Sequence, residues 1–422
     1  MNEKTDNELP ANWEAGKTSD GRVFYIDHHT QKTQWEHPIT KQIQFIPKGS
    51  YSIILIEKKR SFLFCLLELP TGWKEVVEKN GTVVYVDEKN KCFTTGDPQL
   101  MFKKESSTNY GHQSSALQIL YGIDLSNKTA IVTGANTGIG FEITRSLAKH
   151  GCQVILACRN MTKGEAACSK IRKEQENANV SCRKLDLCSL RNVKQFAEQY
   201  RQERLPLHIL VLNAGILNVT FRLTEDGYEE MFQVNYLSQA YLAFGLLAPM
   251  LATKTDSPPR IIAISCESHR VESPGISIIN GIITDRLSPR SPQYFDHLLA
   301  YGQSKLCLIM FIAAFRRNQP QVYAVSCHPG NAINSELTRN SYAYQFLVLL
   351  TRPFAKSLQQ AAATPIFCTI MKHILNEPTV YYNNCDEGSP SSFVYNIKLI
   401  DDLWIQTQTM IELAFKKQPL II

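Results

Sequence analysis

The chain has 422 residues, of which 44% are hydrophobic and 20% charged, with a formal net charge of +6. This length predicts two or three folded units with at least one large core, and the composition is typical of a globular protein. The positive charge is mild and scattered, so we expect no nucleic-acid partner.

The twelve cysteines include no C-x-x-C pair and no repeating spacing. We therefore predict free thiols in a reducing compartment rather than a disulfide framework, and no metal site. The N-terminal sequence is polar and acidic, unlike a secretory signal. No uninterrupted apolar run reaches about 18 residues, so we expect no transmembrane helix and a cytoplasmic protein.

Two segments near the N-terminus, residues 9–38 and 69–98, repeat one another. Each begins with Leu-Pro, carries a Trp at the matching place (Trp13 and Trp73), and ends on a Pro. In each, an Asp-Gly or Asn-Gly turn signal precedes alternating β-branched and aromatic residues, which predicts strand–turn–strand. The two predicted all-β modules span residues 7–40 and 67–100.

The segment between the modules, residues 41–66, is irregular, with β-prone apolar runs near 51–56 and 62–67. Two interpretations stay open. One is an extra hairpin packed on a neighbour, and the other is a segment of imperfect exon definition that is absent from the main protein product. Residues 101–122 are predicted to be a polar linker, and residues 123–415 alternate strand and helix patterns.

A glycine-rich turn follows the short apolar strand predicted over Thr129–Thr133 and precedes an amphipathic helix over Phe141–His150. Three glycines on this spacing allow a tight turn, close approach of backbone to a pyrophosphate, and contact between helix and strand. The free N–H groups of the helix would face the phosphates. The predicted dinucleotide contacts are Gly134, Asn136, Thr137, Gly138, Ile139 and Gly140.

The next predicted strand, Gln153–Cys158, is followed by Arg159 instead of a carboxylate. A carboxylate at this place would bind the ribose hydroxyls of NAD. A guanidinium matches phosphate geometry, so Arg159 would pair with the 2′-phosphate of NADP. The alternative is a solvated surface arginine. We prefer NADP as the cofactor, with NAD as the alternative.

Two further strands end in residues suited to the same cofactor. The strand Val180–Leu185 precedes Asp186 and Leu187, which can reach the adenine edge. The strand His208–Leu212 precedes three residues whose small size would let backbone lie against the cofactor. These three residues are Asn213, Ala214 and Gly215.

The motifs TGANTGIG, LDL, LNAG, VNYL, ISCESHR, YGQSK and HPGN occur in this order. Their order and spacing resemble the short-chain dehydrogenase/reductase family, in the branch that carries two N-terminal WW domains. The resemblance covers nearly the whole chain outside residues 42–67. It implies an α/β fold with a Rossmann-type doubly wound sheet of about seven parallel strands. Later strands predicted over Arg260–Ser265, Val322–Cys327 and Thr379–Tyr382 agree with that fold.

The resemblance also implies hydride transfer between a nicotinamide and an alcohol or carbonyl carbon. Tyr301 and Lys305 are four residues apart, so on a helix they share a face. Tyr301 would move a proton to or from the substrate oxygen, while Lys305 would lower the phenol pKa and hold the nicotinamide ribose. Asn235 would support a proton-relay water. Residues lining the nicotinamide would be Pro329 and Gly330, followed by Asn331–Asn334.

One position departs from the family pattern. The serine that steadies the substrate oxygen aligns with Cys266, and a thiol is a weaker hydrogen-bond donor. Losing a comparable donor in other enzymes costs about 10²–10³ in rate. Strand alternation turns Ser265 to the opposite side, whereas Ser268 can substitute if the strand has ended. We expect weak reductase activity with cofactor binding intact.

The interval from Cys266 to Tyr301 is either an active-site flap that shapes a lipophilic pocket or surface decoration.

By resemblance, Phe24 and Trp35 of the first module form an aromatic groove for an extended proline-rich peptide. Neighbouring residues would receive the tyrosine of a Pro-Pro-x-Tyr ligand. The second module has Val84, Glu88 and Thr95 at groove positions, so we predict negligible peptide binding there. The predicted peptide-binding residues are Phe24, Ile26, His28, Gln31, Thr33 and Trp35.

Two functions of different classes remain. The first is an NADP-dependent oxidoreductase acting on a lipophilic alcohol or carbonyl, with steroids among the candidates. The second is an adaptor that recruits Pro-Pro-x-Tyr proteins, with a weakly active or inactive reductase domain as a cofactor-responsive scaffold. Asn235, Tyr301 and Lys305 favour the first, and Cys266 favours the second. The resemblance implies signalling in growth suppression and apoptosis, and locations in the nucleus or mitochondria besides the cytoplasm.

Overall fold

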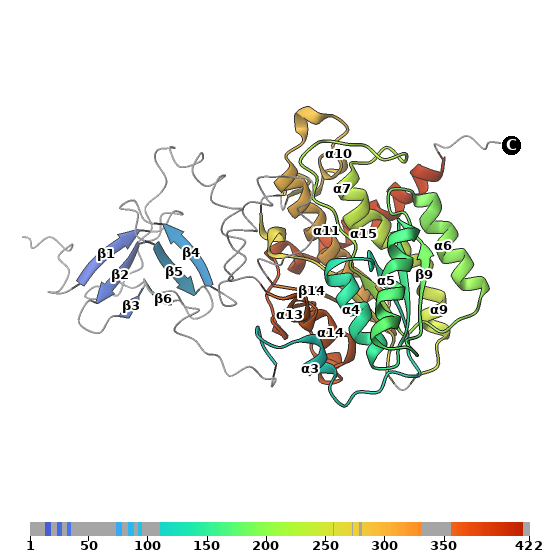
Figure 1. Cartoon of the computed structure of the whole chain (residues 1–422). Helices are drawn as coiled ribbons and strands as arrows, with labels where there is room; N and C mark the ends of the chain where they lie inside the picture. Colours follow the sequence, from blue (N-terminus) through green and yellow to red (C-terminus); the bar gives the residue numbers. More distant parts are fainter. Residues whose placement is uncertain are drawn as a thin grey trace, which may run out of the picture. The chain divides into compact units, whose positions relative to one another are not determined.

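The computed structural model divides the chain into two compact units, Met1–Glu105 and Ser106–Ile422 (Figure 1). In the first unit it describes the strands of two small sheets. In the second unit it describes residues 110–255, 257–271, 273–277, 281–330 and 356–416.

The first unit holds two three-stranded antiparallel sheets. Their registers match, since Trp13 pairs with Asp27 in one sheet and Trp73 pairs with Asp87 in the other. These sheets confirm the predicted strand–turn–strand repeats. The first sheet consists of β1 (Trp13–Lys17), β2 (Val23–Asp27) and β3 (Lys32–Gln34), and the second of β4 (Trp73–Val77), β5 (Val83–Asp87) and β6 (Cys92–Thr94).

Part of the predicted peptide groove falls on described strands. Phe24 and Ile26 lie in β2 and Thr33 lies in β3. The other predicted groove residues, His28, Gln31 and Trp35, lie outside the described residues, as do residues 41–66.

The second unit is built on an eight-stranded sheet of order β16-β15-β14-β11-β10-β7-β8-β9. Seven strands are parallel, and β16 pairs antiparallel with β15 at the edge. The chain starts in the middle at β7, runs outward to β9, returns to β10 and runs outward to β15. This doubly wound order confirms the Rossmann-type prediction. The strands are β7 (Thr129–Thr133), β8 (Gln153–Cys158), β9 (Val180–Lys184), β10 (Ile209–Leu212), β11 (Arg260–Ile264), β14 (Tyr323–His328), β15 (Tyr381–Asn383) and β16 (Asp386–Glu387).

Helices cover both faces of this sheet, so the central strands β7, β10 and β11 are buried along their whole length and are mainly apolar. Alternate residues of β7 serve the two cores: Ile131 faces one, and Ala130 and Val132 face the other. The first core includes α6 (Leu190–Gln202), α8 (Ser238–Gly245), α11 (His297–Asn318) and α15 (Ile397–Lys416), and the second includes α3 (Ala116–Leu120), α4 (Gly138–Lys149), α5 (Met161–Glu174) and α14 (Ala363–Ile370).

Helix α3 corrects one prediction. Its Ile119 and Leu120 are buried in the core that α4 also enters. The polar linker expected over residues 101–122 is therefore wrong for residues 110–122, while residues 101–109 lie outside the described part. The polar residues that suggested a linker include the cap of this helix, where Ser115 and Gln118 form a capping box. A helix of five residues is too short to give a periodic apolar signal.

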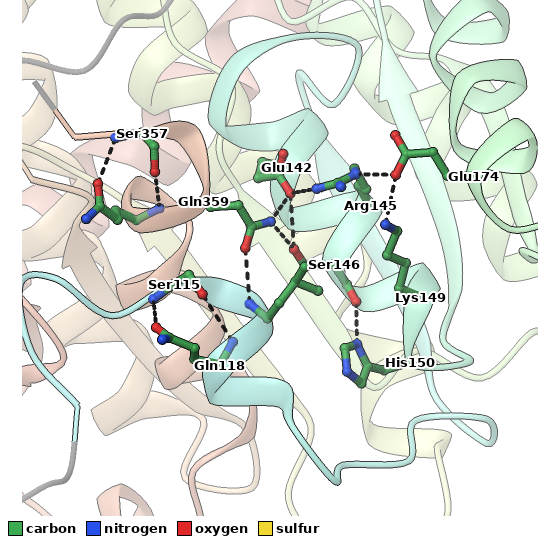
Figure 2. A network of polar contacts seen from close by, with 12 residues as sticks. Ser115, Gln118, Glu142, Arg145, Ser146, Lys149, His150, Glu174, Ser357 and Gln359 are labelled. Carbon is green, nitrogen blue, oxygen red and sulfur yellow. Dashed lines mark hydrogen bonds and ion pairs between the residues drawn. The ribbon is translucent and has the colours of Figure 1, made fainter. Parts of the chain in front are cut away.

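A polar network joins α3, α4, α5 and α13 (Leu358–Ala361) (Figure 2). Gln359 on α13 donates to Glu142 on α4 and accepts from the Leu117 N–H of α3 at 3.2 Å. Glu142 in turn pairs with Arg145 at 2.5 Å, and Arg145 pairs with Glu174 on α5 at 2.7 Å. The network therefore fixes the helix that follows the glycine-rich turn from three directions.

Helix α11 is long and apolar, and among the described residues it is the one helix that could cross a membrane by length and composition. Most of it is buried inside the fold. Its N-terminus is capped by Asp296, which accepts hydrogen bonds from Leu298 N and Leu299 N. The burial is that expected of a core helix in a doubly wound fold, and this helix carries Tyr301 and Lys305.

Candidate active site

The glycine-rich turn between β7 and α4 requires glycine at three positions, one of which is Gly138 with φ +60°. Gly134 has φ +64°, a left-handed conformation that favours glycine. A Cβ on Gly140 would lie 2.7 Å from the Gly134 carbonyl oxygen and would overlap the Asn213 amide. Close approach of backbone at this turn is the condition that a pyrophosphate site requires.

The first turn of α4 faces outward from this loop. Thr137 is the N-cap residue, but its side chain makes no capping hydrogen bond. The first amides of a helix have no partner within the helix, and they carry the positive end of its dipole. The predicted residues Asn136, Thr137, Gly138 and Ile139 therefore surround a helix N-terminus suited to an anion.

Asn213 fastens the end of β10 to this turn. Its Nδ2 donates to the Thr133 carbonyl at 2.8 Å. The backbone N–H groups of Asn213 and Ala214 both donate to the Thr133 hydroxyl at 2.9 Å. Gln239 donates to the Ala214 carbonyl at 2.8 Å. The structure thus brings the two predicted cofactor segments together through side-chain bonds to one threonine.

Arg159 and Asp186 lie at the ends of the neighbouring strands β8 and β9, as the sequence predicted. Arg159 is exposed, and its guanidinium lies 3.7 Å from the Cys188 sulfur. Asp186 accepts a hydrogen bond from Cys188 N at 3.0 Å. The side chain of Leu187, the residue after Asp186, is buried in the core. The Leu187 carbonyl accepts a hydrogen bond from the Ser238 hydroxyl. Sequence reasoning did not single out Cys188, although it stands two residues after Asp186.

Tyr301 and Lys305 lie one turn apart on α11, with the Lys305 Nζ 5.8 Å from the centre of the Tyr301 ring. The Lys305 ammonium is buried and donates to the Ile264 carbonyl at 2.9 Å. Burial lowers the pKa of Lys305. A Cβ on Gly215 would lie 3.2 Å from that ammonium. The predicted catalytic pair therefore meets the predicted cofactor residues at the same edge of the sheet.

Asn235 lies in a π-helical turn, Gln233–Leu237, a feature often found at functional sites. Its Oδ1 accepts from Ile216 N at 2.8 Å, and its Nδ2 donates to the Ile216 carbonyl at 3.0 Å and to Ser304 Oγ at 3.1 Å. Ser304 also donates to the Tyr301 carbonyl at 2.7 Å. The side chain of Asn235 thus holds the loop after β10 against α11. Ser304 was missed by sequence reasoning, although it lies one helical turn after Tyr301.

Cys266 is half-buried two residues after β11 and packs against a small apolar cluster that contains Tyr301. Ser265 is turned away, since its hydroxyl donates to the Lys305 carbonyl at 3.2 Å, which confirms the expectation from strand alternation. We call the apolar group around the phenol the Tyr301 cluster. Its members are Leu217, Met231 and Tyr301, with Ile216, Cys266, Phe295 and Ala300 packed against them.

His269 holds the backbone of Cys266 in place. It is fully buried, and burial lowers its pKa to about 4, so the ring is neutral at pH 7. Its Nδ1 lies 2.6 Å from the Cys266 carbonyl, and its Nε2 lies 3.1 Å from Ser391 N. The neutral ring therefore donates from Nδ1 and accepts at Nε2. Sequence reasoning missed this residue.

The adjacent Glu267 anchors the same turn to β15. Its carboxylate accepts from the Tyr381 hydroxyl at 2.8 Å and from Arg270 Nε at 2.5 Å. Burial alone raises the pKa of Glu267, but Arg270, His328 and His269 outweigh it and hold that pKa at about 2. The Glu267 carboxylate is thus charged and bonded to Tyr381 and Arg270.

The interval between Cys266 and Tyr301 borders the site in part. Phe295 packs on the Tyr301 cluster and forms an edge-on pair with Phe221, with ring centres 5.6 Å apart. This contact favours the flap interpretation over surface decoration. Residue 272 and residues 278–280 lie outside the described part. The interval contains η2 (Glu267–Arg270), β12 (Ile276–Ser277), β13 (Gly281–Ile282), α10 (Thr284–Leu287) and η3 (Pro292–Tyr294).

Pro329 and Gly330 are buried directly after β14. Gly330 has φ +103°, and a Cβ there would lie 2.5 Å from the Nζ of Lys356. Lys356 also binds Asn384. Asn331–Asn334 lie outside the described residues. Among the residues that are described, no group of three or more His, Cys, Asp or Glu side chains could hold a metal ion.

Comparison with known proteins places these features in a family. Residues 128–278 match the model of the short-chain dehydrogenases, and residues 9–38 match that of the WW domain. A WW domain-containing oxidoreductase of Gallus gallus is 41% identical, over 96% of this chain and 95% of its own length. Retinol dehydrogenase 12 of Mus musculus is 35% identical, over 67% of this chain and 85% of its own.

A solved structure shares the fold of the second unit. The crystal structure of an uncharacterised protein from Mycobacterium paratuberculosis superposes with a TM-score of 0.51 at 24% identity. The match covers 68% of this chain and 95% of that one.

Glu229 is a buried carboxylate beside the site. It caps α7 (Glu230–Phe232) by accepting hydrogen bonds from Met231 N at 2.9 Å and Phe232 N at 2.8 Å. Burial raises its pKa to about 7 despite these bonds. The capped segment leads into the π-helical turn with Asn235 and carries Met231 of the Tyr301 cluster.

This carboxyl makes stability depend on pH. In the unfolded chain it ionises near pH 4.3, so between about pH 4.5 and 7 the folded protein binds more protons. The free energy of unfolding should therefore fall as pH rises through this window, by up to about 3 kcal/mol for this group. Urea unfolding at pH 5 and pH 8 measures this decrease in the free energy of unfolding. The decrease should be smaller in Glu229→Gln by the contribution of this carboxyl, and it should be unchanged in the exposed control Glu225→Gln. An unchanged pH dependence in Glu229→Gln would count against the assignment.

Proposed function

Because the chain belongs to the WW domain-containing oxidoreductases, a branch of the short-chain dehydrogenases, we propose that its second unit is an NADP-dependent reductase or dehydrogenase for lipophilic alcohols or carbonyl compounds. The observation that carries this proposal is the meeting of Tyr301, Lys305 and Asn235 beside Gly215, at the edge of the sheet where the glycine-rich turn lies.

The residues at this edge fit a dinucleotide. The backbone of the β7–α4 turn and Asn213 leave no room for a side chain at Gly140, and the N-terminus of α4 would hold the diphosphate. Arg159 is the exposed cation at the end of β8 and would hold the 2′-phosphate of NADP. Asp186 would meet the adenine. When bound, the nicotinamide supplies or accepts the hydride.

The protein's own part in the reaction is proton transfer and alignment. The Tyr301 hydroxyl would give a proton to the substrate oxygen in reduction and take it back in oxidation. The Lys305 ammonium, fixed by the Ile264 carbonyl, would stabilise the phenolate. Asn235 and Ser304 position α11 against the loop after β10. Cys266 would contact the substrate oxygen only weakly, because a thiol is a poor donor.

The substrate class follows from the Tyr301 cluster. Apart from Tyr301, Cys266 and the thioether of Met231, its members are hydrocarbon side chains, and the Phe221–Phe295 pair extends it. An apolar carbonyl compound would lose its hydration at little cost in such surroundings. Similarity to a protein named retinol dehydrogenase supports a retinoid-like or steroid-like molecule.

The central prediction concerns residue 266. Cys266→Ser should raise turnover of retinaldehyde or of ketosteroids by about 10²-fold, because a hydroxyl restores the hydrogen bond to the substrate oxygen. Tyr301→Phe in that background should remove the gain. NADPH oxidation followed by absorbance measures both. No increase in turnover on any carbonyl of the panel would remove the thiol as the explanation of weak activity.

We further propose that the first module binds Pro-Pro-x-Tyr segments of partner proteins and makes the chain an adaptor. This proposal is supported by the match of residues 9–38 to the WW domain and by the sheet β1–β3. A role in growth control or apoptosis and a cytoplasmic location belong to the same proposal. The second module keeps the sheet β4–β6 but has Thr95 where the first has Trp35.

The two modules should therefore differ in binding. In a titration of the full chain with a labelled Pro-Pro-x-Tyr peptide, followed by fluorescence anisotropy, Trp35→Ala should weaken affinity at least about tenfold by removing the aromatic platform. The pair Glu88→His and Thr95→Trp should add a second, weaker site. If Trp35→Ala bound the peptide with wild-type affinity, the first module would be excluded as the binding site for Pro-Pro-x-Tyr segments.

A further inference from the structure

The cysteines of this chain are not equivalent. Of the ten cysteines whose side chains the structure describes, seven are buried, and Cys182, Cys188 and Cys266 are half-buried. Burial raises the pKa of both Cys182 and Cys188 to about 12, and neighbouring charges contribute to both shifts. At Cys188 these charges are those of Asp186 and Glu230. At pH 8 a thiol with such a pKa is ionised in roughly one molecule in 10⁴. Since the thiolate is the nucleophile, these two cysteines should react slowly.

Cys266 has different neighbours. It packs against the Tyr301 cluster, and the buried Lys305 ammonium is bonded to the Ile264 carbonyl, two residues before it in the chain. The carboxylate of the next residue, Glu267, accepts hydrogen bonds from Tyr381 and Arg270. The thiol thus belongs to the same cluster as the phenol ring, next to the strand end that binds the Lys305 cation.

The backbone of Cys266 is also fixed. The neutral His269 ring bridges the Cys266 carbonyl and Ser391 N, and Glu267 ties the same turn to β15. A nucleophile held in one place next to an apolar surface attacks a bound electrophile more readily than a mobile one. The hydrocarbon members of the Tyr301 cluster provide that surface.

We propose that Cys266, Tyr301 and Lys305 form a covalent capture site for α,β-unsaturated ketones and aldehydes with apolar tails. The thiolate sulfur forms a bond to the β-carbon, and the electron pair of the double bond moves toward the carbonyl. The α-carbon then takes up one proton, equal to the one the thiol lost. The product is a thioether with its carbonyl intact, so no oxidant, reductant or cofactor is consumed.

Each member of the set has a part in this addition. The Tyr301 hydroxyl would donate a hydrogen bond to the carbonyl oxygen and so make the β-carbon more electrophilic. The Lys305 ammonium would stabilise the thiolate. A serine at position 266 would not add, because its hydroxyl is not ionised near neutral pH. The substitution that weakens hydride transfer therefore supplies a nucleophile to the same site.

The test uses the full chain with trans-3-nonen-2-one as the probe and no added cofactor. Intact-protein mass and peptide mapping would follow the adduct at pH 8. We expect Cys266 to be labelled at least about tenfold faster than Cys182 or Cys188. Saturated 2-nonanone should give no adduct. In protein unfolded by guanidinium, the three cysteines should become similar in rate.

Variants separate the site from general thiol chemistry. Cys266→Ser should lose the fast adduct, whereas the matched control Cys188→Ser should keep it. Tyr301→Phe should slow labelling of Cys266 several-fold. Equal labelling of Cys266 and Cys188 in the folded chain, or an equal rate in Tyr301→Phe, would overturn the proposal. Because no hydride is transferred in the assay, a protein that never oxidises NADPH can still give the expected result.

Discussion

The second unit depends on one close contact, between Gly140 in the first turn of α4 and the Asn213 amide after β10. Because no Cβ intervenes, the helix N-terminus can sit against the ends of β7 and β10. Asn213 then bonds to Thr133, which fixes β10 against the turn. The loop that continues from β10 reaches Lys305 through Gly215. The absence of a side chain at Gly140 thus lets the glycine-rich turn lie against the segment that continues to α11.

Helix α11, which carries Tyr301 and Lys305, is held by side-chain hydrogen bonds to two other segments. Lys305 is tied to β11, and Asn235 and Ser304 tie α11 to the loop after β10. Cys266 departs from this arrangement, since it presents sulfur where the family has a hydroxyl, on a turn that His269 holds rigidly. The same geometry therefore favours a weak reductase and a reactive thiol.

Local patterns predicted most of the fold, and tertiary contacts explain what they missed. Most of the parallel strands are apolar runs, although β9 is not, and the glycine spacing of the turn is a local signal. Helix α3 was missed because three buried residues give no period. His269 and Ser304 were missed because partners of their side chains, such as Ser391 and Asn235, lie far along the chain. Glu229 was missed because its burial depends on the tertiary fold, although its capping bonds to Met231 and Phe232 are local. The position of Tyr301 and Lys305 on one face of a helix could be predicted from their spacing of four residues alone.

The most direct test of this account is a titration of NADPH, followed by cofactor fluorescence, with wild-type protein and two alanine variants. Gly140→Ala places a methyl group where Asn213 already lies, whereas Gly111→Ala has open space. The account predicts saturable binding by the wild type and by Gly111→Ala, and a loss of at least about tenfold in affinity for a folded Gly140→Ala. Equal affinity in all three, or no saturable binding by the wild type, would contradict it.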